Sequence, residues 1–165
     1  MVMGTSHEHC QDCDPAGLTN GSRHMTGEEK RTIIEAYVHA FNAFDVEGMV
    51  AYLHPDARCI TIVDGVVTCS VEGIDYVRSH ELAESARCSS RKKTVMECYE
   101  RGEQVVLELS YSCVLADDQA GGLKSGDTVT LEGIAEVTFI DEKVSEVAEI
   151  FSAPQLQRKT RTKSI

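Results

Sequence analysis

The residues best suited to proton transfer in this sequence are Glu149, Tyr37 and His80. Glu149 shares one face of a predicted strand with Val147 and Phe151. A carboxylate among apolar neighbours loses hydration, and such an environment suits a group that takes up and returns a proton near neutral pH. The opposite face of this strand is equally apolar, so the pattern leaves open whether Glu149 faces a pocket or solvent.

Tyr37 lies within the apolar stripe of a predicted helix, which comprises Ile33, Ile34, Tyr37, Phe41 and Phe44. Its hydroxyl must therefore find a ligand or a backbone partner in the interior, and both remain open. His80 lies on another predicted helix, and the imidazole group as a class suits a proton shuttle near neutral pH. The alternative for His80 is a partly exposed helix residue. Tyr111 lies on an apolar strand face and offers either a second hydroxyl or a core aromatic ring.

Metal and phosphate chemistry have weaker support. The segment "HEHCQDC" places thiol and imidazole groups close together and could bind zinc, but a short terminal Cys-x-x-C is weak evidence. No glycine-rich phosphate loop occurs between a strand and a helix. We therefore expect neither a metal site nor a cofactor.

The elements that would position these residues fall into helices followed by strands. Helices are predicted over 27–44, 46–53 and 73–87, the first introduced by a capping-box pattern at Thr26 and Glu29. Short strands at 58–63 and 66–71 flank Asp64-Gly65, a strong hairpin signal. Longer strands are predicted near 92–101, 104–116, 127–140 and 143–152.

Alternation in the long strands predicts one buried sheet face. One face of the strand at 104–116 is apolar throughout, with Val105, Leu107, Leu109, Tyr111, Cys113 and Leu115. The pattern indicates an antiparallel sheet whose buried face is covered by the three preceding helices, which is an α+β domain. We place this domain at 25–153, after a flexible extension at 1–24 and before a basic tail at 154–165.

Charge and cysteine content narrow the possible partners. The chain carries a formal charge of −11, and its basic residues include four in the last eight positions, so the preceding chain is more acidic still. Such a chain repels phosphate backbones, and we expect no nucleic-acid partner. The sequence also bears on the location of the protein, because no apolar run is long enough to cross a membrane. Seven scattered cysteines and the lack of a secretory signal favour a cytoplasmic location.

Three segments carry a resemblance to a known superfamily: "AYVHAFNAFDVEGMVAYLHPDA", "VEGIDYVRSH" and "YSCVLADDQAGGLKSGDTVTLEGIAEVTFIDEKVSEVAEIF". Over about 26–152 the chain resembles the SnoaL-like and ketosteroid-isomerase-like branch of the nuclear-transport-factor-2-like superfamily. The resemblance implies a cone-shaped curved sheet wrapped around three helices, with a deep pocket.

The same resemblance assigns roles residue by residue. The tyrosine of the steroid isomerases falls on Tyr37, but their two carboxylic acids fall on Thr61 and Ala135, which argues against that reaction. The acidic residue of SnoaL-like cyclases falls on Glu149, with Val147 where some cyclases have histidine.

We therefore predict a small cofactor-independent protein that binds a compact apolar or carbonyl-containing molecule. Catalysis would use Glu149, His80 and Tyr37 for isomerisation, cyclisation or dehydration. The residues expected to line the ligand site are Tyr111, Thr61, Val147 and Phe151. The alternative is a non-catalytic ligand-binding or dimeric module of the same fold. Apolar residues on the outer sheet face, Val106, Val114, Ile134 and Ile140, predict a homodimer.

Overall fold

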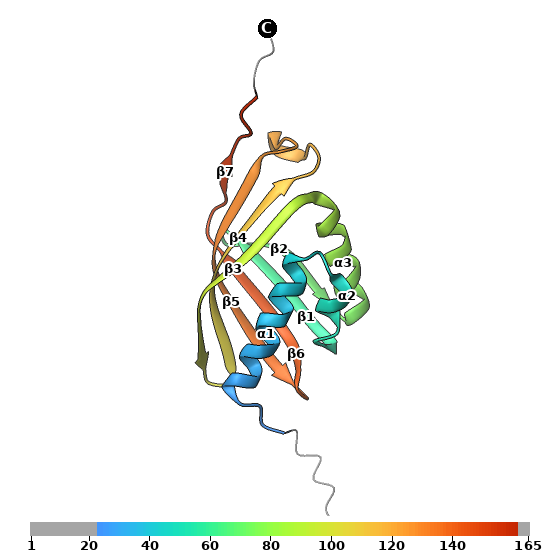
Figure 1. Ribbon diagram of the computed structural model, residues 1–165, viewed down its shortest axis with the longest axis vertical. Coiled ribbons are helices and arrows are strands. Elements are labelled where there is room, and N and C mark those ends of the chain that lie inside the picture. Colours follow the sequence, from blue (N-terminus) through green and yellow to red (C-terminus); the bar gives the residue numbers. More distant parts are fainter. Residues whose placement is uncertain (1–22, 162–165) are drawn as a thin grey trace, which may run out of the picture.

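The computed structural model describes residues 23–161, so the "HEHCQDC" segment lies outside the described residues (Figure 1). Its helices are α1 (Gly27–Asn42), α2 (Val46–Val50) and α3 (Ile74–Arg87). Its strands are β1 (Leu53–Val63), β2 (Val66–Glu72), β3 (Cys88–Arg101), β4 (Gln104–Leu115), β5 (Thr128–Ile140), β6 (Lys143–Phe151) and β7 (Gln155–Gln157). Within this part of the chain, every helix is too short or too polar to cross a bilayer.

The strands form one curved sheet in the order β2-β1-β6-β5-β4-β3, with β7 paired to β5. Figure 1 shows α1 lying across the concave side of this sheet, with α2 and α3 beside it. All strand pairs are antiparallel except β1 and β6, which run parallel, so the sheet is mixed. The predicted α+β class and the curved sheet packed on three helices are confirmed.

Helix α1 begins and packs as its sequence predicts. The Thr26 side chain accepts a hydrogen bond from the Glu29 backbone at 3.2 Å, and the Glu29 side chain accepts one from the Thr26 backbone at 2.9 Å. These two bonds satisfy backbone donors that a helix start otherwise leaves free. The apolar stripe of α1 then packs into the core, where Ile34, Tyr37 and Phe41 are buried.

The first hairpin also forms where its sequence predicts. Asp64 and Gly65 both have positive φ angles, 49° and 76°, as the tight turn between β1 and β2 requires. Strand β1 begins earlier than predicted, at Leu53, and α2 correspondingly ends at Val50. Pairing with β6 is interrupted between Leu53 and Arg58. This interruption accommodates Pro55, which has no backbone N–H to donate to a neighbouring strand.

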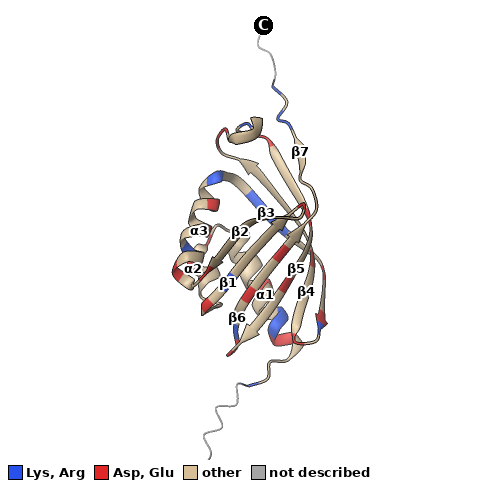
Figure 2. Ribbon diagram, turned by 180° about the vertical axis from the view of Figure 1, so that it is seen from behind, with Lys and Arg blue, Asp and Glu red and all other residues tan. Residues whose placement is uncertain are grey.

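The expected exposure of apolar residues on the convex face of the sheet, the side away from α1 (Figure 2), is wrong at one position. Val106, predicted to be exposed there, is 0% exposed. It lies between Tyr99 and Glu136 in the ladder, and their larger side chains flank it on both sides. Ile140 is exposed as predicted, whereas Val114 and Ile134 are partly buried.

The chain beyond the expected domain end at 153 returns to the sheet. Strand β7 pairs with Thr128–Thr130 of β5, and the next residues contact the buried Asp127. The Asp127 carboxylate accepts hydrogen bonds from the Lys159 backbone at 3.1 Å and from Arg158 Nη1 at 3.0 Å. Backbone N–H groups of Lys159 and Lys124 hold the pKa of Asp127 below its ordinary value.

Candidate functional site

The position of Glu149 follows from the order of the strands. Strand β6 lies between β1 and β5, and in this register Glu149 pairs with Thr61 on one side and Ala135 on the other. These are the two positions at which the resemblance would place the carboxylic acids of a steroid isomerase. The chain thus carries one carboxylate between a threonine and an alanine.

Glu149 faces the concave side of the sheet and forms an ion pair there. Lys93 Nζ, from β3, lies 2.8 Å from Glu149 Oε1, and their side chains are only 11% and 14% exposed. The ammonium group stabilises the ionised carboxylate and so opposes the desolvation emphasised by the sequence pattern. The second oxygen, Glu149 Oε2, is buried and has no hydrogen-bond partner in the described structure.

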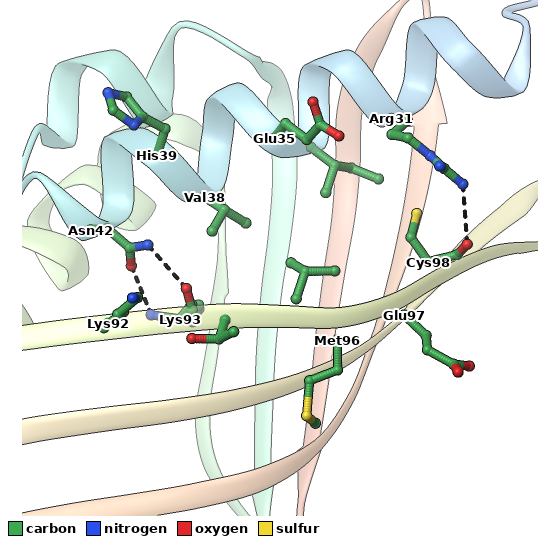
Figure 3. Close-up of a pocket in the computed structure, with 13 residues that line it drawn as sticks. Arg31, Glu35, Val38, His39, Asn42, Lys92, Lys93, Met96, Glu97 and Cys98 are labelled. Atoms are coloured by element: carbon green, nitrogen blue, oxygen red, sulfur yellow. Dashed lines mark hydrogen bonds between the residues drawn. The ribbon is translucent and has the colours of Figure 1, made fainter.

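Lys93 is positioned by the end of α1. The Asn42 side chain accepts a hydrogen bond from the Lys93 backbone N–H at 2.7 Å and donates one to the Lys93 carbonyl at 3.0 Å (Figure 3). The hollow drawn in Figure 3 is an open groove of about 540 Å³ between α1 and β3. Although larger than the cavity at Glu149, this groove does not include the Glu149 carboxylate.

A smaller cavity of about 170 Å³ brings together most of the predicted site residues. We call it the polar cavity. Its lining consists of Phe41, Thr61, Val63, Thr68, His80, Glu81, Glu84, Arg91, Lys93, Tyr111, Leu131, Glu149 and Phe151. Five of the seven residues predicted from the sequence therefore share one cavity: Glu149, His80, Tyr111, Thr61 and Phe151.

The other two predicted residues, Tyr37 and Val147, line a separate space of about 20 Å³, which we call the apolar cavity. Lys93 and Glu149 border both cavities. Burial, reinforced by the nearby Cys59, Glu81 and Glu149, raises the pKa of Tyr37 well above its ordinary value. Among residues 23–161 no group hydrogen-bonds its hydroxyl, so the backbone-bonded core tyrosine of the sequence analysis does not occur there.

Arg91 and Glu81 complete the polar cavity and were not predicted. Arg91 is 6% exposed, its Nε donates to the Phe41 carbonyl at 3.0 Å, and its Nη1 lies 3.8 Å from Glu81 Oε2. Burial raises the pKa of the Glu81 carboxyl. The positive charge of Lys93 opposes this shift, and the negative charge of Glu149 adds to it. A signal for Arg91 and Lys93 existed in the sequence, because they alternate in phase with the inward-facing Val95 of β3.

Two sulfur contacts orient the remaining polar groups. His80 Nε2 lies 3.3 Å from Cys69 Sγ, and the Tyr111 hydroxyl lies 3.7 Å from Cys88 Sγ. Burial raises the pKa of Tyr111, so this hydroxyl keeps its proton and can act as a donor. In residues 23–161 no three histidine, cysteine, aspartate or glutamate side chains converge as a metal-binding group.

The comparisons with known proteins agree with this architecture. The model of the SnoaL-like domain family matches residues 34–147. No curated protein sequence matches the chain significantly.

Solved structures share the fold at low identity. AclR from Streptomyces galilaeus has 17% identity and a TM-score of 0.61, covering 76% of this chain and 90% of its own. A ketosteroid-isomerase-like protein from Catenulispora acidiphila, in complex with trimethylamine, has 11% identity and a TM-score of 0.56, covering 70% and 82%. A computationally designed 17-OHP binder has 12% identity and a TM-score of 0.63, covering 79% and 98%.

These likenesses between structures concern the fold alone, because all three identities are low. The family match covers well over half of the chain, from within α1, which carries Tyr37, to Val147 of β6, two residues before Glu149. The chain therefore belongs to the SnoaL-like domain family.

Proposed function

We propose that this protein binds a compact carbonyl-containing molecule in the polar cavity and that Glu149 transfers a proton within it. The observation that carries the proposal is the buried Lys93–Glu149 pair, in which Oε1 is held by the ammonium group and Oε2 has no partner. A carboxylate held in this way is oriented, and its second oxygen is free to accept a proton.

The reaction would begin at a carbon next to the ligand's carbonyl group. Glu149 removes a proton from that carbon, and the electron pair of the C–H bond moves onto the carbonyl oxygen to give an enolate. The Tyr111 hydroxyl, which lines the polar cavity and keeps its proton, is the donor available to stabilise this oxygen. If a carbon–carbon double bond adjoins that carbon, the enolate is extended, and return of the proton from Glu149 to the far carbon of the double bond completes an isomerisation. If the ligand has a second carbonyl group, attack of the enolate carbon on it forms a ring, and the resulting alkoxide takes the proton from Glu149.

His80 would have a separate role in this reaction. His80 lines the same cavity and suits a relay of protons to the solvent. Tyr37, which the sequence analysis assigned to the carbonyl oxygen, lines the neighbouring apolar cavity and would instead pack beneath the Lys93–Glu149 pair. The donor to the oxygen would then come from the polar cavity itself.

Proton exchange tests the proposal directly. Small ketones and oxo acids are incubated with the protein in deuterated water, and loss of the protons next to the carbonyl is followed by NMR. We expect exchange to be accelerated by the wild type and by Glu146→Gln, but not by Glu149→Gln. Glu146 lies on the same strand and faces the convex side, which makes it a matched control. Equal exchange by the Glu149 variant would reject Glu149 as the base, and binding without exchange would support the non-catalytic module.

We also propose that two copies associate through the convex sheet face. One row of the ladder there is apolar across four strands, with Val67, Ile62, Ile150 and Ile134 in register. Val67 and Ile150 are 58% and 38% exposed. Ion pairs Arg58–Glu146 and Arg101–Glu136 lie on the same face, and an apolar centre with a charged rim is typical of protein interfaces.

A further inference from the structure

Arg91 is buried between aromatic rings, and most of its guanidinium N–H groups have no hydrogen-bond acceptor in the described structure. Its side chain is 1% exposed, and its guanidinium carbon lies 3.8 Å from the ring centre of Phe41 and 4.7 Å from that of Phe44. Only Nε donates a hydrogen bond within residues 23–161. Of the two terminal nitrogens, Nη2 has no hydrogen-bond partner in this part of the chain, and Nη1 approaches Glu81 Oε2 only to 3.8 Å. Burying donors without close acceptors is costly.

Unpartnered charged atoms gather in one place. Three buried side-chain atoms in the described chain have no hydrogen-bond partner, namely Glu81 Oε2, Arg91 Nη2 and Glu149 Oε2. All three belong to residues that line the polar cavity. Because buried polar atoms in native proteins almost always have partners, this coincidence indicates a polar ligand that supplies them.

The charges around the cavity favour an anion. Glu149 is neutralised by Lys93 at 2.8 Å, and Glu84 by Arg87 at 2.9 Å. Glu81 approaches Arg91 only to 3.8 Å, too far for a hydrogen bond, and burial raises the pKa of its carboxyl. The charge of Arg91 is thus the one in the cavity that no neighbour closely compensates.

We infer that the ligand carries a carboxylate that binds the terminal nitrogens of Arg91, which, together with the carbonyl group of the proposed function, makes it a short oxo acid. The planar guanidinium edge matches the two oxygens of a carboxylate, and such two-point pairs are strong and specific. The cavity volume of about 170 Å³ is below the range of roughly 300–1,000 Å³ typical for drug-sized ligands, which favours a compact ligand. The inference rests on the proposed function in that both use the polar cavity.

Matched pairs of ligands separate the contribution of the carboxylate to binding from that of the carbonyl group. We suggest 4-oxopentanoate with hexane-2,5-dione, and 5-oxohexanoate with heptane-2,6-dione, because each pair differs by replacement of a carboxylate with an acetyl group. Binding is measured by NMR titration of the full chain. The wild type should bind at least one acid about tenfold to a hundredfold more tightly than its dione, the range expected for one hydrogen bond to a charged group.

Two arginine variants test whether the preference for the acid depends on Arg91. Arg91→Lys keeps the charge but removes the planar edge, and it should abolish most of the preference for the acid over its dione. Arg87→Lys is the control, since Arg87 is exposed and pairs with Glu84 on α3. Thermal melting of both variants verifies that they are folded. Equal affinity for acid and dione, an unchanged preference in Arg91→Lys, or no binding of either acid would overturn the inference.

Proton exchange on the same ligands distinguishes this inference from the proposed function. Acid binding that depends on Arg91 without exchange of the protons next to the carbonyl would keep the carboxylate site and reject proton transfer. Exchange that depends on Glu149 with no preference for the acids would keep proton transfer and reject the carboxylate site.

Discussion

Lys93 and Glu149 meet across the concave side of the sheet although their strands are not neighbours. Strands β5 and β4 lie between β6 and β3 in the sheet, yet Lys93 Nζ is 2.8 Å from Glu149 Oε1. The curvature of the sheet brings the two side chains together. The contact therefore links the stability of the fold to the geometry of the candidate site.

Lys93→Met should lower the free energy of unfolding by about 3 kcal/mol or more, because it leaves the Glu149 carboxylate buried without a counter-charge. Lys92→Met is the control, since Lys92 is exposed and its side chain forms no ion pair within the described residues. The control should change stability by no more than about 0.5 kcal/mol. Urea unfolding of both variants measures the difference. Similar small losses in the two variants would show that the ion pair contributes little.

Glu81 should make stability depend on pH. Its pKa is raised on folding from the ordinary value of 4.5, so the folded chain holds this proton more tightly than the unfolded chain. The associated stabilisation is complete below pH 4.5 and is lost as pH rises through the folded pKa. Relative to Glu81→Gln, the wild type should therefore lose stability as pH rises above 4.5. Thermal melting of both proteins across pH 4 to 8 tests this, and a constant difference would contradict it.

Tyr37→Phe should change the free energy of unfolding by less than about 1 kcal/mol, because no described group loses a hydrogen-bond partner and the ring volume is kept. Tyr37→Ala, in contrast, should cost about 3–5 kcal/mol by leaving a cavity in the core. Chemical denaturation compares the two. A loss of about 1–3 kcal/mol in Tyr37→Phe would instead reveal a buried partner of the hydroxyl.

Ile150→Glu should convert the proposed dimer into a monomer, because it places a charge within the apolar row on the convex face. Ile140→Glu is a matched control. Ile140 is 51% exposed but lies at the end of the β5–β6 hairpin, outside that row. Light scattering at micromolar protein concentration gives the mass of each variant. A monomeric wild type would reject the dimer, and dissociation by Ile140→Glu alone would move the interface to the hairpin end.

Local sequence determined much of the fold. The capping box at Thr26 and Glu29 set the start of α1, and Asp64-Gly65 set the first hairpin, because each depends on contacts between residues close in the chain. Strict alternation identified the buried face of β4, since side chains of a strand point to opposite sides in turn. The same period placed Glu149, Val147 and Phe151 on one face without showing which face was inward.

Tertiary structure decided the rest. The facing of Glu149 depends on the pairing of β6 with both β1 and β5, including a parallel pair between segments far apart in the sequence. The partners Lys93, Arg91 and Glu81 come from β3 and α3, and no local pattern relates them to Glu149. Sequence periodicity specifies the direction of a side chain within its own element. Only the packing of elements and the curvature of the sheet determine which charges face one another.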